Sequence, residues 1–393
     1  MYRIQEATVI SPSALVGFIL LSHERRGLQH DRLTSLIGFI LKWADRRGAR
    51  VSNSLKATLL RHQKDIQEAD EEGALEGFKV RGQSVAQLTD EALTLLKRLV
   101  DRVERSGQVI YVVPDKSRIE LDYYRNSLLG LIAPEAIMCS VLASYREGTV
   151  WEILKKETRW VSELFKLEFI YRNDQPFETI IRNVLDHLIE VGIIEEQEGV
   201  YKVIMKEEAF TLSSSLRHLF ECYWVAAHTL KATINTPIEG KKWVKSAREQ
   251  ADLAFLQGEI RRAEAASSVA LTNALQWFVR QGWVHEETHF EGNKRIKTYQ
   301  IQSSDAFEVF FERLARILAR LPESPPPQLS PLHYYQDQEE MNIQESLDPS
   351  PHPSVEDDVE IQAGQIDSDS DLYSEVQSET HSETHSEMPH EDA

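Results

Sequence analysis

Two stretches near the start of the sequence carry apolar positions at helical spacing. Ser11-Pro12-Ser13 supplies a hydroxyl cap and a proline for a first helical turn, and residues 14–21 form an apolar body typical of a buried helix. Further apolar residues recur every three or four positions, which predicts an amphipathic helix ending near Arg47: Leu33, Leu36, Ile37, Ile40 and Leu41. We therefore expect this part of the chain to be helical.

A pattern of helix, glycine and short hairpin occurs twice in the second half of the chain. Residues 177–192 have helical periodicity and end at a glycine, and the strand-like residues after them turn at Glu198-Gly199. Residues 267–282 and 283–301 repeat the pattern. Each copy predicts a winged-helix-like module.

A less complete copy is expected around residues 89–113. Thr89 is a suitable helix cap, apolar residues between 93 and 103 form a helix face, and Gly107 ends it. Residues 108–113 form a β-branched run closed by Pro114, which predicts a strand. The preceding residues 73–88 contain three glycines and little periodicity, so we expect an irregular insertion.

The fold class that follows is mainly α (α+β), a helical body with two or three winged-helix-like modules. Further helices are expected at 151–170, 210–235, 241–262 and 303–321. The expected regions are an N-terminal helical region (1–88), a helix-strand module (89–146), a winged-helix-like module (147–209), a helical region with a second such module (210–321) and a disordered acidic tail (322–393).

Composition supports the tail and limits the partners. The net charge is −19, but 19 of the 63 acidic residues and none of the 44 basic residues lie from Leu321 onward. The rest of the chain is therefore balanced, which argues against the strong electrostatic attraction of a nucleic-acid-binding protein. Apolar residues are too sparse in the tail to offset the entropy of ordering it.

Cysteine content and hydropathy bear on location. Cys139 and Cys222 lie in apolar surroundings, so we expect buried thiols in a reducing, cytoplasmic compartment. No apolar run approaches the ~20 residues that span a bilayer, so any membrane contact is expected to be peripheral, at the inner face of the cytoplasmic membrane.

One segment carries a family resemblance. Residues 121–129, which include Tyr123-Tyr124-Arg125-Asn126 and lead into Pro134, resemble a segment downstream of the catalytic domain in membrane-bound bacterial glycerol-3-phosphate acyltransferases. Residues 2–16, 163–194 and 213–284 are similar to other parts of the C-terminal half of that family, in the same order. The resemblance implies that Tyr123, Tyr124, Arg125 and Asn126 form a family surface. On packing grounds alone, the same residues would be a helix start with half-buried tyrosine rings.

The catalytic pair of this family is not found in the expected body of the chain. The family uses a histidine and an aspartate five positions apart, and here only His352 and Asp357 have that spacing, inside the expected tail. A second family motif is faintly matched by residues 290–295, but Gly292-Asn293 is an ordinary turn signal. We therefore expect no catalytic, cofactor or metal residues, and the sequence leaves open whether the chain is an enzyme.

The resemblance implies a partner and a docking element. We expect an accessory, docking or regulatory role with a catalytic acyltransferase domain or subunit in glycerophospholipid synthesis. Val9, Ile10, Leu15 and Phe18 would then lie near a surface that the catalytic half covers in the family. The alternative for this helix is that it packs entirely inside the chain. The alternative function is a winged-helix adaptor or nucleic-acid-binding protein.

Overall fold

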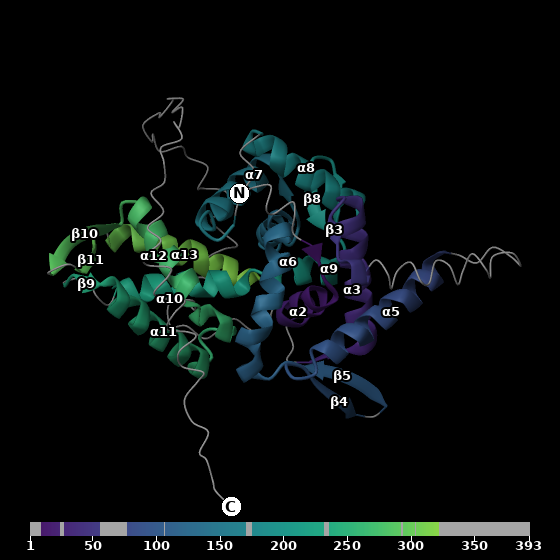
Figure 1. The fold of residues 1–393 in the computed structure, drawn as a ribbon. Coiled ribbons are helices and arrows are strands. Elements are labelled where there is room, and N and C mark those ends of the chain that lie inside the picture. Colours follow the sequence, from purple (N-terminus) through teal and green to yellow (C-terminus); the bar gives the residue numbers. More distant parts are fainter. Residues whose placement is uncertain are drawn as a thin grey trace, which may run out of the picture. The chain divides into compact units, whose positions relative to one another are not determined.

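A computed structural model describes residues 9–23, 27–55, 77–105, 107–169, 175–231, 236–291, 294–302 and 304–321 (Figure 1). All of them belong to one of the two compact units of the chain, Met1–Pro327. The expected tail at 322–393, including His352 and Asp357, lies outside the described residues. The expectations that follow are compared with the described part alone.

Three repeats share one order of elements, namely a helix, a short strand, two helices and a hairpin. The first repeat contains α2 (Pro12–Ser22), β2 (Gly27–Gln29), α3 (His30–Arg46), α5 (Gly77–Leu95), β4 (Asp101–Arg105) and β5 (Gln108–Val112). The second contains α6 (Asp115–Leu142), β6 (Thr149–Val150), α7 (Trp151–Leu164), α8 (Phe177–Glu190), β7 (Ile194–Gln197) and β8 (Val200–Val203). The third contains α10 (Arg217–Lys231), β9 (Ile238–Glu239), α11 (Gly240–Gln257), α12 (Ser268–Arg280), β10 (Val284–Glu291) and β11 (Lys294–Ile301).

The sheets of the three repeats also have one strand order. In each, the second hairpin strand lies in the middle, between its hairpin partner and the short strand: β2-β5-β4, β6-β8-β7 and β10-β11-β9. The remaining elements are β1 (Val9–Ile10), β3 (Arg50–Val51), α9 (Lys206–Ser214), the 3-10 helix η2 (Ala263–Ala266) and α13 (Ser304–Arg320). The mainly α fold with helix-plus-hairpin units is therefore confirmed, and the copy near residue 100 is complete.

The expectations for residues 77–107 need correction, and residues 73–76 of the expected irregular insertion lie outside the described residues. Residues 77–95 form the helix α5, and Thr89 lies inside it, where its hydroxyl donates to the Val85 carbonyl at 2.7 Å. Val85, Leu88 and Ala92 are buried at helical spacing, and this burial outweighs the weak helix propensity of the glycines. The expected helix face across 93–103 is also wrong, because α5 ends at Leu95 and the following strands turn at Gly107, whose φ is 75°.

Other helix bounds differ from those expected. Helix α6 starts at Asp115 rather than near residue 121, and it continues through Pro134. The helix expected at 210–235 is two helices, α9 and α10, and the one expected at 241–262 ends at Gln257 beside the left-handed Gly258. The segment that carries the family resemblance therefore lies within a long helix and not at its start.

Helix α2 is the buried centre of the first repeat, and it packs along α6 (Figure 1). Ten of its eleven residues are buried. Gly17 permits the close approach, since a Cβ atom there would lie only 3.1 Å from the Cβ of Tyr124 and 3.4 Å from the backbone nitrogen of Arg125. The close packing at Gly17 thus fixes the position of the Tyr124-Arg125 turn of α6 against α2.

A second junction joins the end of α7 to α10 and α12. The Glu168 carboxylate accepts hydrogen bonds from the Tyr223 hydroxyl and the Asn273 amide, each at 3.1 Å, and both partners are buried. Burial raises the pKa of Glu168 to about 7, although the hydrogen bonds from Asn273 and Tyr223 act in the opposite direction. This carboxyl group is therefore largely protonated in the folded protein below neutral pH.

The raised pKa of Glu168 predicts an unusual pH dependence of stability. Because its pKa is 4.5 in the unfolded chain and about 7 when folded, the free energy of unfolding should fall as pH rises from 4.5 to 7. The contribution is on the order of 3 kcal/mol. Glu168→Gln should therefore stabilise the protein more at pH 8 than at pH 5, measured by thermal unfolding. Glu163→Gln, at an exposed position of α7, is the control, and equal effects of the two substitutions at both pH values would contradict this assignment.

Candidate functional site

The four residues of the expected family surface do not face the same way. Tyr123 is 80% exposed and Asn126 is exposed, whereas Tyr124 is half-buried and Arg125 is 0% exposed. Their positions follow from helical geometry, because consecutive residues of α6 point about 100° apart. The segment therefore contributes side chains to two opposite faces of one helix.

The outer face of α6 carries an aromatic and apolar strip. Ile119 is 65% exposed and lies one turn before Tyr123. The Tyr123 and Tyr124 rings meet edge to face with centroids 5.8 Å apart, and the Asn126 amide donates to the Asp122 carboxylate at 3.0 Å. We call Ile119, Tyr123 and Asn126 the outer α6 face.

The inner face of α6 carries charged side chains that are buried. The Arg118 guanidinium donates to both carboxylate oxygens of Glu264 in η2, at 3.0 and 3.1 Å. Arg125 forms an ion pair with Asp122, and its Nη1 lies 3.8 Å from Glu264 Oε1. The last distance is too long for a hydrogen bond, so Arg125 acts on Glu264 through its charge.

The pKa values of this cluster show which charges dominate. Burial alone would raise the pKa of Glu264, but Arg118 and Arg125 outweigh it and hold the pKa at about 2. The pKa of Asp122 is raised, mainly by burial and against the effect of Arg125. Burial and the nearby Arg125 and Arg262 lower the pKa of His218, so its imidazole is neutral. Glu264 is thus the fixed negative charge around which the arginines gather.

The cluster extends to α2 and α10. Glu221 on α10 accepts hydrogen bonds from the backbone N–H groups of Arg261 and Arg262, at 3.1 and 2.9 Å, and from Arg217 at 2.7 Å. The Arg262 guanidinium reaches the backbone carbonyls of Ser22 and His23 at the end of α2, at 3.5 and 3.4 Å. We call Arg118, Asp122, Arg125, Arg217, Glu221, Arg262 and Glu264 the buried ion network. It connects elements of all three repeats.

The docking element expected near Val9 needs correction. Val9 is 45% exposed, but Ile10, Leu15 and Phe18 are 1%, 0% and 0% exposed. Ile10 sits in a parallel strand pair opposite Val51, and Leu15 and Phe18 face the core around α6. The alternative, that this helix packs inside the chain, is what the structure shows, and Ile10→Asp is expected to destabilise the fold.

The described residues offer few groups for acid–base or nucleophilic chemistry. Burial raises the pKa of the Cys139 and Cys222 thiols, so neither forms a thiolate readily. No group of three metal-binding side chains occurs within the described part of the chain. The faint motif at 290–295 belongs to a hairpin in which Phe290 pairs with Arg295, and its turn at Gly292-Asn293 lies outside the described residues.

Sequence reasoning missed the buried ion network. Arg118, Asp122 and Arg125 follow at helical spacing on one face of α6, which could have indicated a charged inner face. Their partner Glu264 is 146 residues away from Arg118 in the sequence, and no local pattern points to it.

Within the described residues, no helix is both long enough and apolar enough to cross a bilayer.

The buried ion network generates a stability prediction. Glu264→Gln removes the charge that compensates Arg118 and Arg125, so the free energy of unfolding in urea should fall by about 3–5 kcal/mol. Glu308→Gln is a matched control, because Glu308 pairs with Lys231 at an exposed site and its loss should change stability by less than about 1 kcal/mol. Equal losses in the two variants would show that the network does not stabilise the fold.

Comparisons with known proteins agree with the resemblance seen in the sequence. The family described as the glycerol-3-phosphate acyltransferase C-terminal region matches residues 1–69 and 66–287. No curated protein matches the chain. The matched residues make up most of the chain and include all of α6 and η2. The chain therefore belongs to the family of glycerol-3-phosphate acyltransferase C-terminal regions.

Proposed function

We propose that this chain is an accessory, docking or regulatory partner of a catalytic acyltransferase domain or subunit in glycerophospholipid synthesis. The observation that carries this proposal is the family match over residues 1–287, which concerns the C-terminal region and not the catalytic half. The expected His/Asp pair is missing from the sequence between residues 1 and 321. These two observations support a role in which the chain binds a catalytic domain and does not catalyse the reaction itself.

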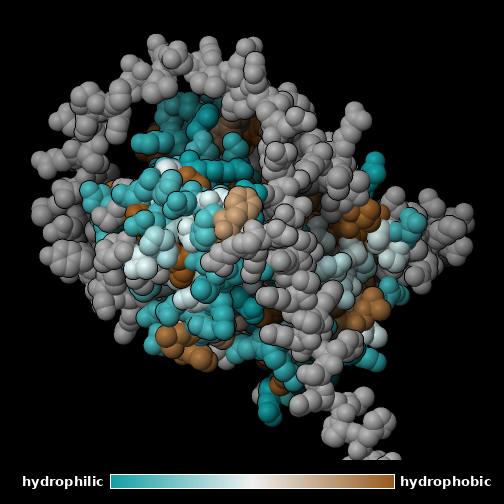
Figure 2. All heavy atoms as spheres, turned by 60° about the vertical axis from the view of Figure 1, so that its left-hand side comes forward, coloured by the Kyte–Doolittle hydropathy of each residue, from teal (hydrophilic) through white to brown (hydrophobic). Residues whose placement is uncertain are grey.

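The outer α6 face is the docking surface that we propose for this partner. Tyrosine is one of the residue types that most often anchor protein interfaces. Figure 2 shows one face of the molecule, on which apolar residues form small separate patches among hydrophilic side chains. The buried ion network holds the inner side of α6, so Ile119 and Tyr123 would be presented by a rigid helix.

We further propose a cytoplasmic location with peripheral contact at the inner membrane face, and that the three helix-plus-hairpin repeats are winged-helix-like modules. Their bounds differ from the regions expected from the sequence, because α5 crosses the boundary at residues 88 and 89. The common strand order, with a short strand beside the second hairpin strand, supports such modules. Loss of binding to a membrane after removal of the acyltransferase partner would be consistent with this location.

The alternative is a winged-helix adaptor or nucleic-acid-binding protein, and charge argues against it. In a nucleic-acid-binding module we would expect basic residues on the helix that precedes the hairpin. Here α8 carries Glu178, Asp186 and Glu190 against one arginine, and α12 has a single charged residue, Arg280. Neither helix has the basic face that binding to phosphates requires.

The proposal predicts binding without intrinsic catalysis. The purified chain should bind a catalytic acyltransferase domain that carries the His/Asp pair, measured by isothermal titration calorimetry. The double variant Ile119→Asp, Tyr123→Asp should weaken this binding by about tenfold or more, because it removes exposed anchors. Leu256→Asp is the matched control, since Leu256 is 82% exposed on α11 and is not a residue of the outer α6 face.

The chain alone should show no acylation of glycerol 3-phosphate that depends on an acyl donor. Turnover that persists in His352→Ala would contradict this expectation and show that other residues perform the chemistry. Binding that is equally strong in the double variant and the control would instead reject the outer α6 face as the docking surface.

A further inference from the structure

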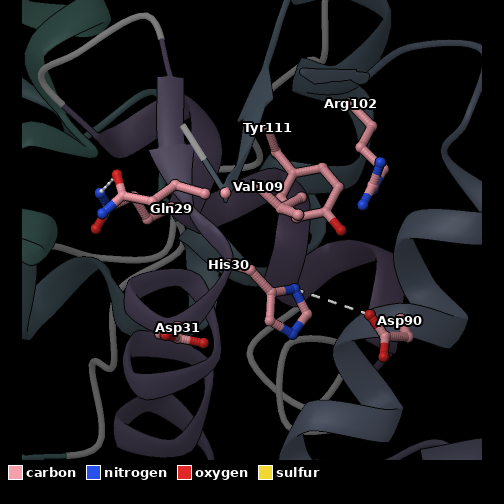
Figure 3. Close-up of a pocket in the computed structure, with 9 residues that line it drawn as sticks. Gln29, His30, Asp31, Asp90, Arg102, Val109 and Tyr111 are labelled. Carbon is pink, nitrogen blue, oxygen red and sulfur yellow. Dashed lines mark hydrogen bonds and ion pairs between the residues drawn. The ribbon is translucent and has the colours of Figure 1, made fainter. Parts of the chain in front are cut away.

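A polar cavity of about 420 Å³ lies between the sheet of the first repeat and helices α3 and α5 (Figure 3). Its lining includes the side chains of His30, Asp31, Asp90 and Arg102, and Tyr111 forms part of the wall. This volume lies at the lower end of the range for small-molecule sites, about 300–1,000 Å³. The cavity is separate from the outer α6 face and from the buried ion network.

The fold brings these residues together from four elements. His30 is the first residue of α3 and directly follows β2, and Asp90 lies on α5. Arg102 on β4 and Tyr111 on β5 are directly opposite each other in the sheet, so both side chains are on one face. Figure 3 shows the Tyr111 hydroxyl between Arg102 on one side and His30 and Asp90 on the other.

The contacts among the polar groups of the lining are long or exposed, and Arg102 is also a hydrogen-bond partner of the Tyr111 hydroxyl, which acts to lower the pKa of Tyr111. His30 Nδ1 and Asp90 Oδ1 are 3.8 Å apart, which is too long for a direct hydrogen bond. Arg102 contacts Glu104 at 3.3 Å, but both side chains are more than half exposed, so this pair contributes little and can open. Burial and the nearby Asp90 raise the pKa of Tyr111, so its hydroxyl remains a hydrogen-bond donor at neutral pH.

The balance of charges selects the class of ligand. An anion without a positive group would meet the carboxylates of Asp31 and Asp90. A cation without a negative group would meet the guanidinium of Arg102. A molecule that carries both charges can satisfy Arg102 and Asp90 at the same time, because these groups lie on either side of Tyr111.

We propose that this cavity binds a small zwitterion, with its anionic group at Arg102 and its ammonium group at Asp90. Phosphate esters of amino alcohols have this chemistry, either as free molecules or as the headgroup of an aminophospholipid. We expect Asp90 to prefer a primary ammonium group, because the N–H groups of a primary ammonium donate hydrogen bonds to a carboxylate. A quaternary ammonium has no N–H group to donate.

Binding of defined probes to the full chain tests the class and the source of the ligand. Isothermal titration with phosphoethanolamine should show saturable binding, and ethanolamine or inorganic phosphate should bind at least about tenfold more weakly, because each loses one charged contact. Binding only to vesicles that contain phosphatidylethanolamine, and not to vesicles of phosphatidylcholine alone, would support a lipid headgroup as the source. No binding in either format, or equal binding of inorganic phosphate, would overturn the proposal.

Paired variants test the site. Asp90→Asn and Arg102→Gln should each weaken binding of the probe by about tenfold or more, because each removes one charged partner. Glu91→Gln and Arg105→Gln make similar charge changes at neighbouring residues that do not line the cavity, and they should bind as the unaltered protein does. Equal weakening by the variants and their controls would overturn the assignment, and thermal unfolding midpoints would show that all four proteins are folded.

Discussion

Glu264 is buried with the arginines of α6, and the arrangement of the three repeats depends on this contact. A buried carboxylate loses its hydration, which costs several kcal/mol unless opposite charges and hydrogen bonds replace it. Arg118 supplies two hydrogen bonds and Arg125 supplies further positive charge, so Glu264 remains ionised. Two residues earlier, Arg262 reaches the carbonyls at the end of α2. The segment from Arg262 to Glu264 in the third repeat therefore contacts α2 of the first repeat and α6 of the second.

This constraint gives α6 two roles. Its inner side is fixed by charge and by close packing against Gly17 of α2. Its outer side keeps Tyr123 and Ile119 exposed. Since the helix backbone is already ordered, a partner that covers the outer α6 face would pay little further conformational entropy.

Strong local patterns made much of the fold predictable, whereas contacts between distant segments could not be predicted. Amphipathic spacing predicted α3, α8 and α12, and Glu198-Gly199 predicted the hairpin of β7 and β8. The part of α5 before Thr89 was missed because glycines obscured its periodicity, and the burial of this helix depends on contacts with α2 and α3. The short strands β2, β6 and β9 have only two or three residues, too few for a pattern, and they exist through pairing with a hairpin formed later in the chain.

The candidate site shows the same division. The resemblance identified the Tyr123-Tyr124-Arg125-Asn126 segment, but only the structure separates the exposed Tyr123 from the buried Arg125. Arg118 and Glu264, like His30 and Asp90, are brought together by the fold from positions far apart in the sequence. A search restricted to fixed spacings along the chain cannot find such pairs.

The reach of Arg262 to the end of α2 also determines how the molecule opens. Each repeat has its own hairpin and helices, so the three could be imagined to unfold one after another, as in a repeat protein. Because α2 is buried and contacts a residue of the third repeat, exposure of its backbone amides requires that this contact be broken. The amide hydrogens of α2 and α6 should therefore exchange with deuterium together, in one cooperative event that spans all three repeats.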